Sequence, residues 1–447
     1  MNDMTKTLQV RLNDQLVGHL RMDTHGEMSF EYDDAYLGVA STPLSQSLPL
    51  RKEPFNQLEC APFFAGLLPD NPQARQALGK QFHVSDDNSF GLLANIGRDC
   101  AGAVVIAPEL QASEPRQGWL EELDEAQLAE LIDNLPHRPL AAVEGEVMLS
   151  LAGVHDKAAV FVDPSGQVSL PHHGHPSSHI LKVDIKGLPD SIRTESFLLK
   201  LAREMKLPVP HSRVGEAEGK TYMLVSRFDR VVSWNEDGSA GRIRRLHQED
   251  FCQALGVPPH MKYEHEGGPT LADMFKLVFK VTRVPVKEVL KLTDYVIYNF
   301  LIGNPDSHAK NYSLVYRPRA VEVSPIYDLN NAKAFEHHFK KVRPRIAQAI
   351  GGERNPEMIG REHWLKFADE CGLRGASVLK RLEAQAEMMP AAVRALREKL
   401  RGTVADCDAL DLVVNDIADR CARVLSWEAA PVPPKLDVPE EAPSLKI

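Results

Sequence analysis

The sequence of 447 residues predicts an α+β protein, in which a small β-rich N-terminal subdomain precedes a core with a mixed α/β lobe and an all-helical lobe. Three observations support this fold class. Apolar and polar residues alternate over residues 7–32, which is typical of half-buried strands. Short β-type runs surround a single helical segment between residues 150 and 232. Beyond residue 246, apolar residues recur almost entirely at the 3.6-residue period of a helix.

Residues 1–110 are expected to form the N-terminal subdomain. Its predicted strands are residues 8–12, 16–20, 28–32 and 104–106. Residues 61–96 carry helical spacing that Pro69 and Pro72 interrupt. The stretch that follows is polar and contains prolines and one helical pattern at residues 121–135, so we predict a helical linker over residues 111–148.

The core is predicted as two lobes, in the manner of a protein kinase. Residues 149–245 form the mixed lobe, with strands at residues 158–162, 179–183 and 222–225 and a helix at residues 194–205. Residues 246–427 form the helical lobe, with helices at residues 248–255, 271–281, 286–301, 376–386, 391–400 and 408–425. Five prolines and no apolar face predict a disordered tail over residues 428–447.

Composition and charge exclude several classes of protein. Hydrophobic residues make up 43 % and charged residues 26 % of the chain, which is ordinary for a globular protein and unlike collagen or a disordered chain. The formal charge of −10 argues against broad electrostatic binding of nucleic acid, so we expect any DNA contact to pass through a partner. No run of about 18 apolar residues and no signal-peptide core occurs, which predicts a cytoplasmic protein without a membrane contact.

The strongest chemical signal is the run Gly303-Asn-Pro-Asp-Ser-His-Ala-Lys-Asn311, which follows an apolar helical segment. Asp306 and Asn311 have the D-x-x-x-x-N spacing of the protein-kinase catalytic loop, in which the aspartate receives the hydroxyl proton and the asparagine holds Mg²⁺. Asp328 comes seventeen residues later, where a kinase carries its second metal ligand. Taken alone, the motif is more typical of a capped loop than of a catalytic loop.

The order of the other charged residues favours phosphoryl transfer. Lys182 ends a short apolar strand pattern, like the kinase lysine that contacts the α- and β-phosphates, and Glu195 follows on the next predicted helix. Protein kinases carry their site residues in the same order along the chain, namely lysine, glutamate, aspartate, asparagine and aspartate. We therefore predict a nucleotide-dependent phosphotransferase.

A phosphate-binding loop should precede the lysine strand, and residues 150–157 occupy that place. The run Ser-Leu-Ala-Gly-Val-His-Asp-Lys lacks the G-x-G-x-x-G pattern, but Gly153 and Lys157 could still bring backbone amides and a cation to phosphates. A plain β-turn remains the alternative at this stage.

These residues together resemble the HipA family, the kinase toxins of bacterial toxin–antitoxin pairs. The resemblance spans about residues 7–425. Its motifs, in order, are Ser150–Gly153, Ser178–Lys182, Glu195–Ala202, Arg227–Arg230, Gln248–Asp250, Lys262–Glu264, Gly267–Pro269, Gly303–Asn311 and Tyr327–Asp328. The fold that the resemblance implies is the same β-rich subdomain joined to a kinase-like core with a helical lobe.

The resemblance implies a serine/threonine protein kinase that uses ATP and Mg²⁺. Its implied target is an aminoacyl-tRNA synthetase, with the glutamyl enzyme as the first expectation, and its phosphorylation would halt translation and promote persistence. The implied partner is a HipB-like helix-turn-helix antitoxin, which would supply the DNA binding that this acidic chain lacks.

The resemblance also assigns roles to individual residues. Asp306 is the catalytic base, Asn311 and Asp328 are metal ligands, and Glu195 orients Lys182. The residues that it assigns to ATP and phosphate binding are Ala152, Gly153, Val154, His155, Asp156, Lys157, Lys182, Val225, Ser226, Phe228, His308 and Lys310. Ser150 falls on the autophosphorylation serine, whose added charge would eject the phosphate loop and switch the kinase off. Whether His308 or Lys310 meets the γ-phosphate is open at this point.

Two alternatives stand beside this interpretation. A small-molecule kinase of the aminoglycoside phosphotransferase type shares the Asp-x-x-x-x-Asn pattern, although the long N-terminal subdomain favours a protein kinase. An inactive corepressor that only binds a helix-turn-helix repressor is the second alternative, and the intact Lys182, Asp306, Asn311 and Asp328 argue against it.

Overall fold

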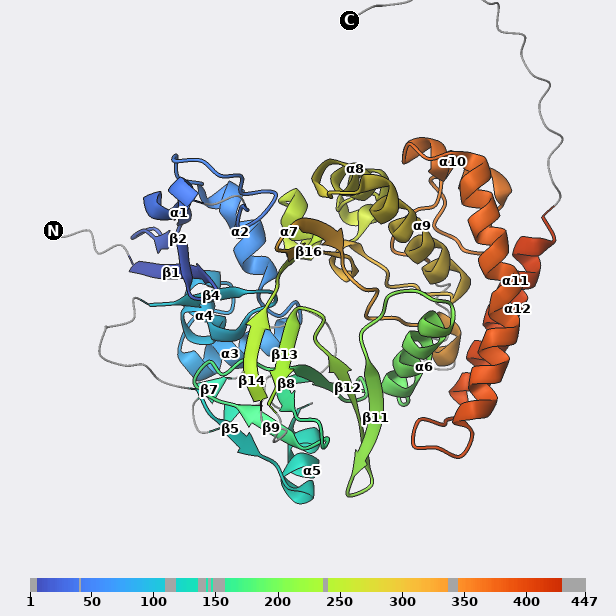
Figure 1. Ribbon diagram of the computed structural model, residues 1–447, viewed down its shortest axis with the longest axis horizontal. Helices are drawn as coiled ribbons and strands as arrows, with labels where there is room; N and C mark the ends of the chain where they lie inside the picture. Colours follow the sequence, from blue (N-terminus) through green and yellow to red (C-terminus); the bar gives the residue numbers. More distant parts are fainter. Residues whose placement is uncertain are drawn as a thin grey trace, which may run out of the picture.

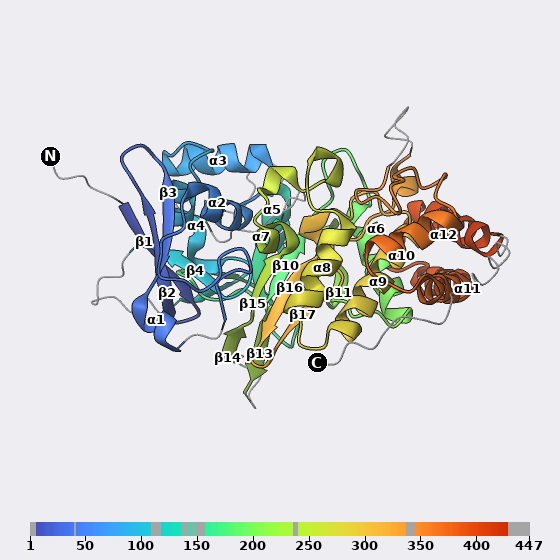
Figure 2. The ribbon, with the colours of Figure 1, turned by 90° about the horizontal axis from the view of Figure 1, so that it is seen from above.

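The computed structural model describes residues 6–39, 42–108, 118–135, 142–143, 146–147, 157–235, 240–336 and 345–427. It confirms the predicted α+β class. The N-terminal subdomain, the mixed lobe and the helical lobe follow one another along the longest axis of the molecule (Figures 1 and 2). No helix in these ranges is both long and apolar enough to cross a membrane.

The N-terminal subdomain is a four-stranded antiparallel sheet covered by helices. Its strands, in the spatial order β3-β2-β1-β4, are β1 (Lys6–Leu12), β2 (Gln15–Met22), β3 (Met28–Tyr32) and β4 (Val104–Ala107). Its helices are α1 (Asp34–Val39), α2 (Gln57–Gly66), α3 (Pro72–Phe82) and α4 (Ser89–Ile96). Every second residue of β3 is buried, and Phe30 from this strand packs against Phe55 and Phe64. This alternation is the pattern that predicted the strands.

The mixed lobe is a six-stranded sheet in the order β11-β12-β10-β8-β9-β5. The strands are β5 (Leu120–Glu122), β8 (Lys157–Val162), β9 (Val168–Pro171), β10 (His179–Lys182), β11 (Ser212–Ala217) and β12 (Lys220–Ser226), and the helices are α5 (Glu125–Asn134) and α6 (Ser191–Glu204). Residues 120–134, expected within the linker, extend this lobe, because Leu128 and Leu131 share a core with Val160 and Leu224.

The C-terminal lobe is mainly helical but also carries a small sheet. Its helices are α7 (Phe251–Leu255), α8 (Leu271–Val281), α9 (Pro285–Leu301), α10 (Arg361–Glu370), α11 (Gly375–Leu400) and α12 (Ala409–Leu425). The sheet, in the order β15-β16-β17, consists of β15 (His247–Asp250), β16 (Ser313–Arg317) and β17 (Ala320–Val323). A two-stranded ribbon of β13 (Arg230–Trp234) and β14 (Ala240–Arg245) joins the lobes.

Two details differ from the predicted helices. The helix expected over residues 248–255 begins at Phe251, because residues 247–250 pair with β16 and Asp250 then caps α7 through Gln253. The two helices expected around Pro390 are one continuous helix, α11, in which Met389 and Val393 on either side of the proline are both fully buried.

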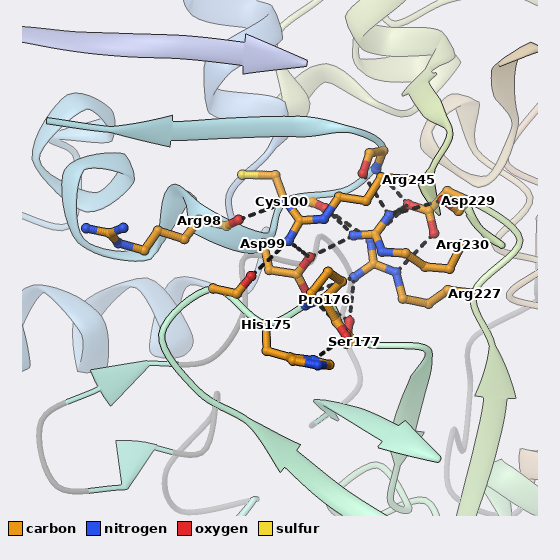
Figure 3. Close-up of polar contacts among 12 residues, drawn as sticks. Arg98, Asp99, Cys100, His175, Pro176, Ser177, Arg227, Asp229, Arg230 and Arg245 are labelled. Atoms are coloured by element: carbon orange, nitrogen blue, oxygen red, sulfur yellow. Dashed lines mark hydrogen bonds and ion pairs between the residues drawn. The ribbon is translucent and has the colours of Figure 1, made fainter. Parts of the chain in front are cut away.

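A buried cluster of charged side chains lies where the N-terminal subdomain meets the end of β12 (Figure 3). Arg227 donates to Asp229 at 2.8 Å, and Arg230 contacts Asp229 at 2.9 Å and Asp99 of the N-terminal subdomain at 2.8 Å. Arg245 from β14 reaches Asp99 at 3.3 Å. Burial alone would raise the pKa of Asp229, but Arg227 and Arg230 outweigh it and hold that pKa well below its usual range. The segment after β12 is therefore fixed to the N-terminal subdomain by paired charges.

Candidate active site

One cavity, of about 220 Å³, lies where the N-terminal subdomain and the two lobes meet. The predicted site residues that line it are Lys157, Lys182, Glu195, Val225, Ser226, Phe228, Asp306, His308, Lys310, Asn311 and Asp328. Residues 150–156 lie outside the described part of the chain, so the structure does not locate Ser150, Ala152, Gly153, Val154, His155 or Asp156. All the predicted site residues that the structure describes therefore share one cavity.

Lys182 connects the two lobes at the back of this cavity. It ends β10, an inner strand paired with β8 and β12, and its Nζ donates to Glu195 Oε1 at 2.7 Å and to Asp328 Oδ1 at 2.8 Å. Glu195 lies on the buried face of α6, whose apolar residues recur at helical spacing. Burial would lower the pKa of Lys182, but Asp328 and Glu195 outweigh it and raise that pKa, so the lysine stays charged.

Asp328 has an unusual backbone conformation. Its φ of 58° lies in the left-handed region, which costs a residue with a Cβ free energy and persists only where the surroundings hold it. The hydrogen bond from Lys182 is one such restraint. Strain of this kind is often found at functional sites and agrees with a role for this carboxylate in the cavity.

The loop after α9 carries Asp306. Gly303 turns the chain with a φ of 67°, and the Asn304 side chain accepts from the Asp306 backbone amide at 3.0 Å. Tyr263 donates its hydroxyl to Asp306 Oδ1 at 2.6 Å. Burial raises the pKa of Asp306, and the hydrogen bond from Tyr263 opposes that rise. The carboxylate is thus held in one orientation and has a raised proton affinity, as a base requires.

Asn311 and Asp328 fit a hard cation. Asn311 Nδ2 donates to the Asp306 carbonyl at 2.7 Å, which fixes the amide in the cavity that Asp328 also lines. Carboxylate and amide oxygens are ligands of the kind that Mg²⁺ takes. Among the described residues no group of three or more His, Cys, Asp or Glu could hold a metal ion. Sites that bind Mg²⁺ through one or two protein ligands and the phosphates of a nucleotide need no such group.

His308 and Lys310 differ sharply in charge. Burial lowers the pKa of His308 to about 3, so its ring is neutral near pH 7. Lys310 is equally buried, but Asp70 at 2.7 Å and Asp250 at 3.8 Å outweigh the desolvation and raise its pKa. Lys310 is therefore the cation of this loop.

The start of β8 and the end of β12 also line the cavity. Lys157 begins β8 in register with Lys182, and burial together with that neighbouring charge lowers the pKa of Lys157 to about 8. Phe228 follows β12, and its ring stacks on Tyr327 with centroids 5.5 Å apart. This apolar end suits a planar base, whereas the lysine end suits anions.

The sequence alone assigned no role in the site to four further residues. Tyr263 contacts Asp306, Asp70 and Asp250 contact Lys310, and Lys262 contacts Asp70. Tyr263 and Lys262 lie in a motif of the family resemblance, which could have drawn attention to them. Asp70 had no such signal, because it lies 240 residues from Lys310 in a segment typical of a turn and a helix cap.

Comparison with known proteins identifies the family. Residues 8–107 match the HipA N-terminal domain and residues 149–393 match the HipA-like C-terminal domain. "Putative kinase Y4mE" of Sinorhizobium fredii is 37 % identical over 94 % of this chain and 98 % of its own. "Serine/threonine-protein kinase toxin HipA" of Shewanella oneidensis is 27 % identical over 87 % of this chain and 89 % of its own.

A solved structure also matches. It is the Shewanella oneidensis complex of HipA, HipB and operator DNA, which superimposes with a TM-score of 0.81 and 27 % identity over 94 % of this chain and 98 % of that one. The chain therefore belongs to the HipA family and is a kinase.

Proposed function

We propose that this kinase transfers the γ-phosphate of ATP to a serine or threonine hydroxyl of a protein, with Mg²⁺ as its metal. The observation that carries the proposal is Lys182, whose ammonium bonds both Glu195 and Asp328 in the cavity that also holds Asp306. This is the arrangement of a kinase site with its lysine and glutamate already paired.

The roles of the residues follow from their chemistry. Asp306 accepts the proton of the substrate hydroxyl, since its raised pKa brings it closer to working pH while Tyr263 keeps it aimed. Lys182 and Lys157 bind phosphate oxygens, and Val225 to Phe228 border the adenine. Asn311 and Asp328 would hold the magnesium ion, which neutralises phosphate charge when bound.

Lys310 is our choice for the contact to the γ-phosphate. A neutral imidazole at His308 offers one hydrogen-bond donor, whereas the Lys310 ammonium also offers a full positive charge in the cavity that holds the catalytic base. Catalysis in this proposal consists of positioning and charge neutralisation, without a covalent enzyme intermediate.

The proposal extends to partners. A HipB-like helix-turn-helix antitoxin is supported by the relative that was solved together with HipB and operator DNA. The net charge of −10 agrees with DNA being reached only through such a partner. An aminoacyl-tRNA synthetase, first the glutamyl enzyme, remains our proposed substrate, and Ser150 our proposed site of inactivating autophosphorylation.

The test is incubation of the purified protein with radiolabelled ATP and Mg²⁺, alone and with a cytoplasmic lysate, followed by autoradiography and mass spectrometry. We expect label on a synthetase-sized protein, and Asp306→Asn should abolish it. Asp419→Asn on the exposed face of α12 is the matched control and should transfer phosphate normally. Transfer only to small molecules would replace the proposal by a small-molecule kinase, and no transfer at all would favour an inactive binding partner.

A further inference from the structure

Asp70 is a carboxylate of the N-terminal subdomain that lies inside the catalytic cavity. It sits between α2 and α3, its side chain is only 11 % exposed, and it accepts from Lys310 Nζ at 2.7 Å. Lys262, which precedes Tyr263, lies 3.5 Å from its other oxygen. A domain outside the two kinase lobes thus contacts the loop that carries Asp306.

The position of Asp70 is fixed by close packing of α2 on α7. Gln253 of α7 donates to the Phe63 carbonyl at 2.9 Å, and Ser47 donates to the Gln253 carbonyl at 2.7 Å. A Cβ on Gly66, at the end of α2, would lie 2.7 Å from Gln253 Cγ, so only glycine allows this approach. The loop that follows α2 is therefore held at a set distance from Lys310.

A carboxylate beside a site for a triphosphate is electrostatically unfavourable unless it is neutralised, because like charges repel. Asp70 is shielded by two lysines, and burial, which would raise its pKa, is outweighed by Lys310 and Lys262, which keep it ionised. Lys310 in turn has Asp250 only at 3.8 Å on its other side. Among the described residues, Asp250 would be the remaining carboxylate within 4 Å of the Lys310 ammonium if Asp70 were removed, and the long side chain would be drawn toward it.

We propose that Asp70 is a positioning residue for phosphoryl transfer, which holds Lys310 at the phosphate end of the cavity so that the N-terminal subdomain completes the active site. The inference rests on the proposed function and adds to it a dependence on a residue outside the kinase core. Asp70 forms no bond to substrate and moves no proton; its carboxylate only orients the ammonium of Lys310.

A double-mutant cycle tests the proposal with the full-length protein. We expect Asp70→Asn to lower kcat at saturating ATP by about tenfold, the effect of one charged hydrogen bond made in the transition state. In a Lys310→Met background the same change should cost less than twofold or restore some activity, because the group that Asp70 positions is gone. If Asp70 had only a structural role, Asp70→Asn would lower kcat by the same factor in the wild-type and in the Lys310→Met background.

Gln46→Ala provides the control, because its side chain donates to the Tyr316 hydroxyl at 2.9 Å across the same domain interface, outside the cavity and apart from the contact of α2 with α7. Its kcat should stay within twofold of the wild type. Should Asp70→Asn fail to fold, Asp70→Glu repeats the cycle with the charge kept and displaced by one methylene, and about threefold is expected. Additive losses, an unaffected Asp70 variant, or an equal loss in Gln46→Ala would overturn the inference while the proposed function stands. An inactive wild type would overturn both.

Discussion

Replacing Tyr263 by phenylalanine removes a single hydroxyl group from the site, the one that donates to Asp306 Oδ1 at 2.6 Å. That hydrogen bond stabilises the ionised carboxylate and so lowers the pKa of Asp306, while burial raises it. In Tyr263→Phe the opposing contribution is lost. The pKa of Asp306 should therefore rise further above its ordinary value.

The size of the change follows from the exposure of the carboxylate. A hydrogen bond to a charged group contributes about 1.5–3 kcal/mol when it cannot be replaced. The Asp306 side chain is 37 % exposed, so water should recover about half of that. A residual loss of about 1 kcal/mol corresponds to a rise of roughly 0.7 pKa units, since one unit is worth about 1.4 kcal/mol.

The assay is the pH dependence of kcat/KM for protein phosphorylation. In the proposed mechanism Asp306 is the base and acts in its deprotonated form, so the rate should fall as the pH decreases through the pKa of Asp306. In Tyr263→Phe this acid limb should move to higher pH by about 0.7 units. At pH values above the limb, kcat/KM of the two enzymes should differ less.

Tyr298→Phe is the matched control for this prediction, because its buried hydroxyl donates at 2.7 Å to the Leu198 carbonyl of α6, where α9 packs against the mixed lobe. It should affect stability and leave the acid limb in place. Coincident limbs for the wild type and Tyr263→Phe would refute the reasoning that Asp306 is the base and that Tyr263 tunes it.

Two further predictions concern buried cations and their counter-charges. Lys182→Met should weaken ATP binding at least tenfold by calorimetry, because Glu195 and Asp328 would then face the phosphates unshielded. The control Lys186→Met, at an exposed position, should bind ATP with normal affinity. Equal affinities of the two variants would contradict the role of Lys182. Asp229→Asn should lower the free energy of unfolding by about 3–5 kcal/mol, because it leaves Arg227 and Arg230 buried with one carboxylate fewer. Asp133→Asn removes a surface pair with Lys220 and should cost under about 1 kcal/mol, and similar melting temperatures for the two variants would speak against the cluster as a source of stability.

The kinase-like residues could be recognised from the sequence because phosphoryl transfer demands particular side chains in a particular order. Lys182, Glu195, Asp306, Asn311 and Asp328 each match a residue type that the chemistry requires, and the structure brings all five to one cavity. The residue types and their order along the chain were enough to predict the site, so no knowledge of distant contacts was needed.

Features that depend on distant pairing could not be predicted in this way. β15 contains Glu249 and Asp250 and resembles the polar start of a helix, but pairing with β16, more than sixty residues later, makes it a strand. Asp70 is a further case, since its own segment only indicates a turn before α3 while its partner Lys310 belongs to another lobe. Tertiary contacts decide both outcomes, and a single sequence does not encode them in any local pattern.

The charge cluster at the end of β12 also bears on the order in which the chain is made. Asp99 precedes its partner Arg227 by 128 residues, so at about 5–20 residues per second a ribosome needs on the order of 10 s to supply the guanidinium after the carboxylate. The core of the N-terminal subdomain, formed by residues 8–106, can close during that interval, but Asp99 must stay hydrated until Arg227 and Arg230 emerge. During synthesis the folded N-terminal subdomain therefore exposes an unpaired carboxylate for several seconds, and the cavity residues Asp306 and Asp328 are made only after both arginines.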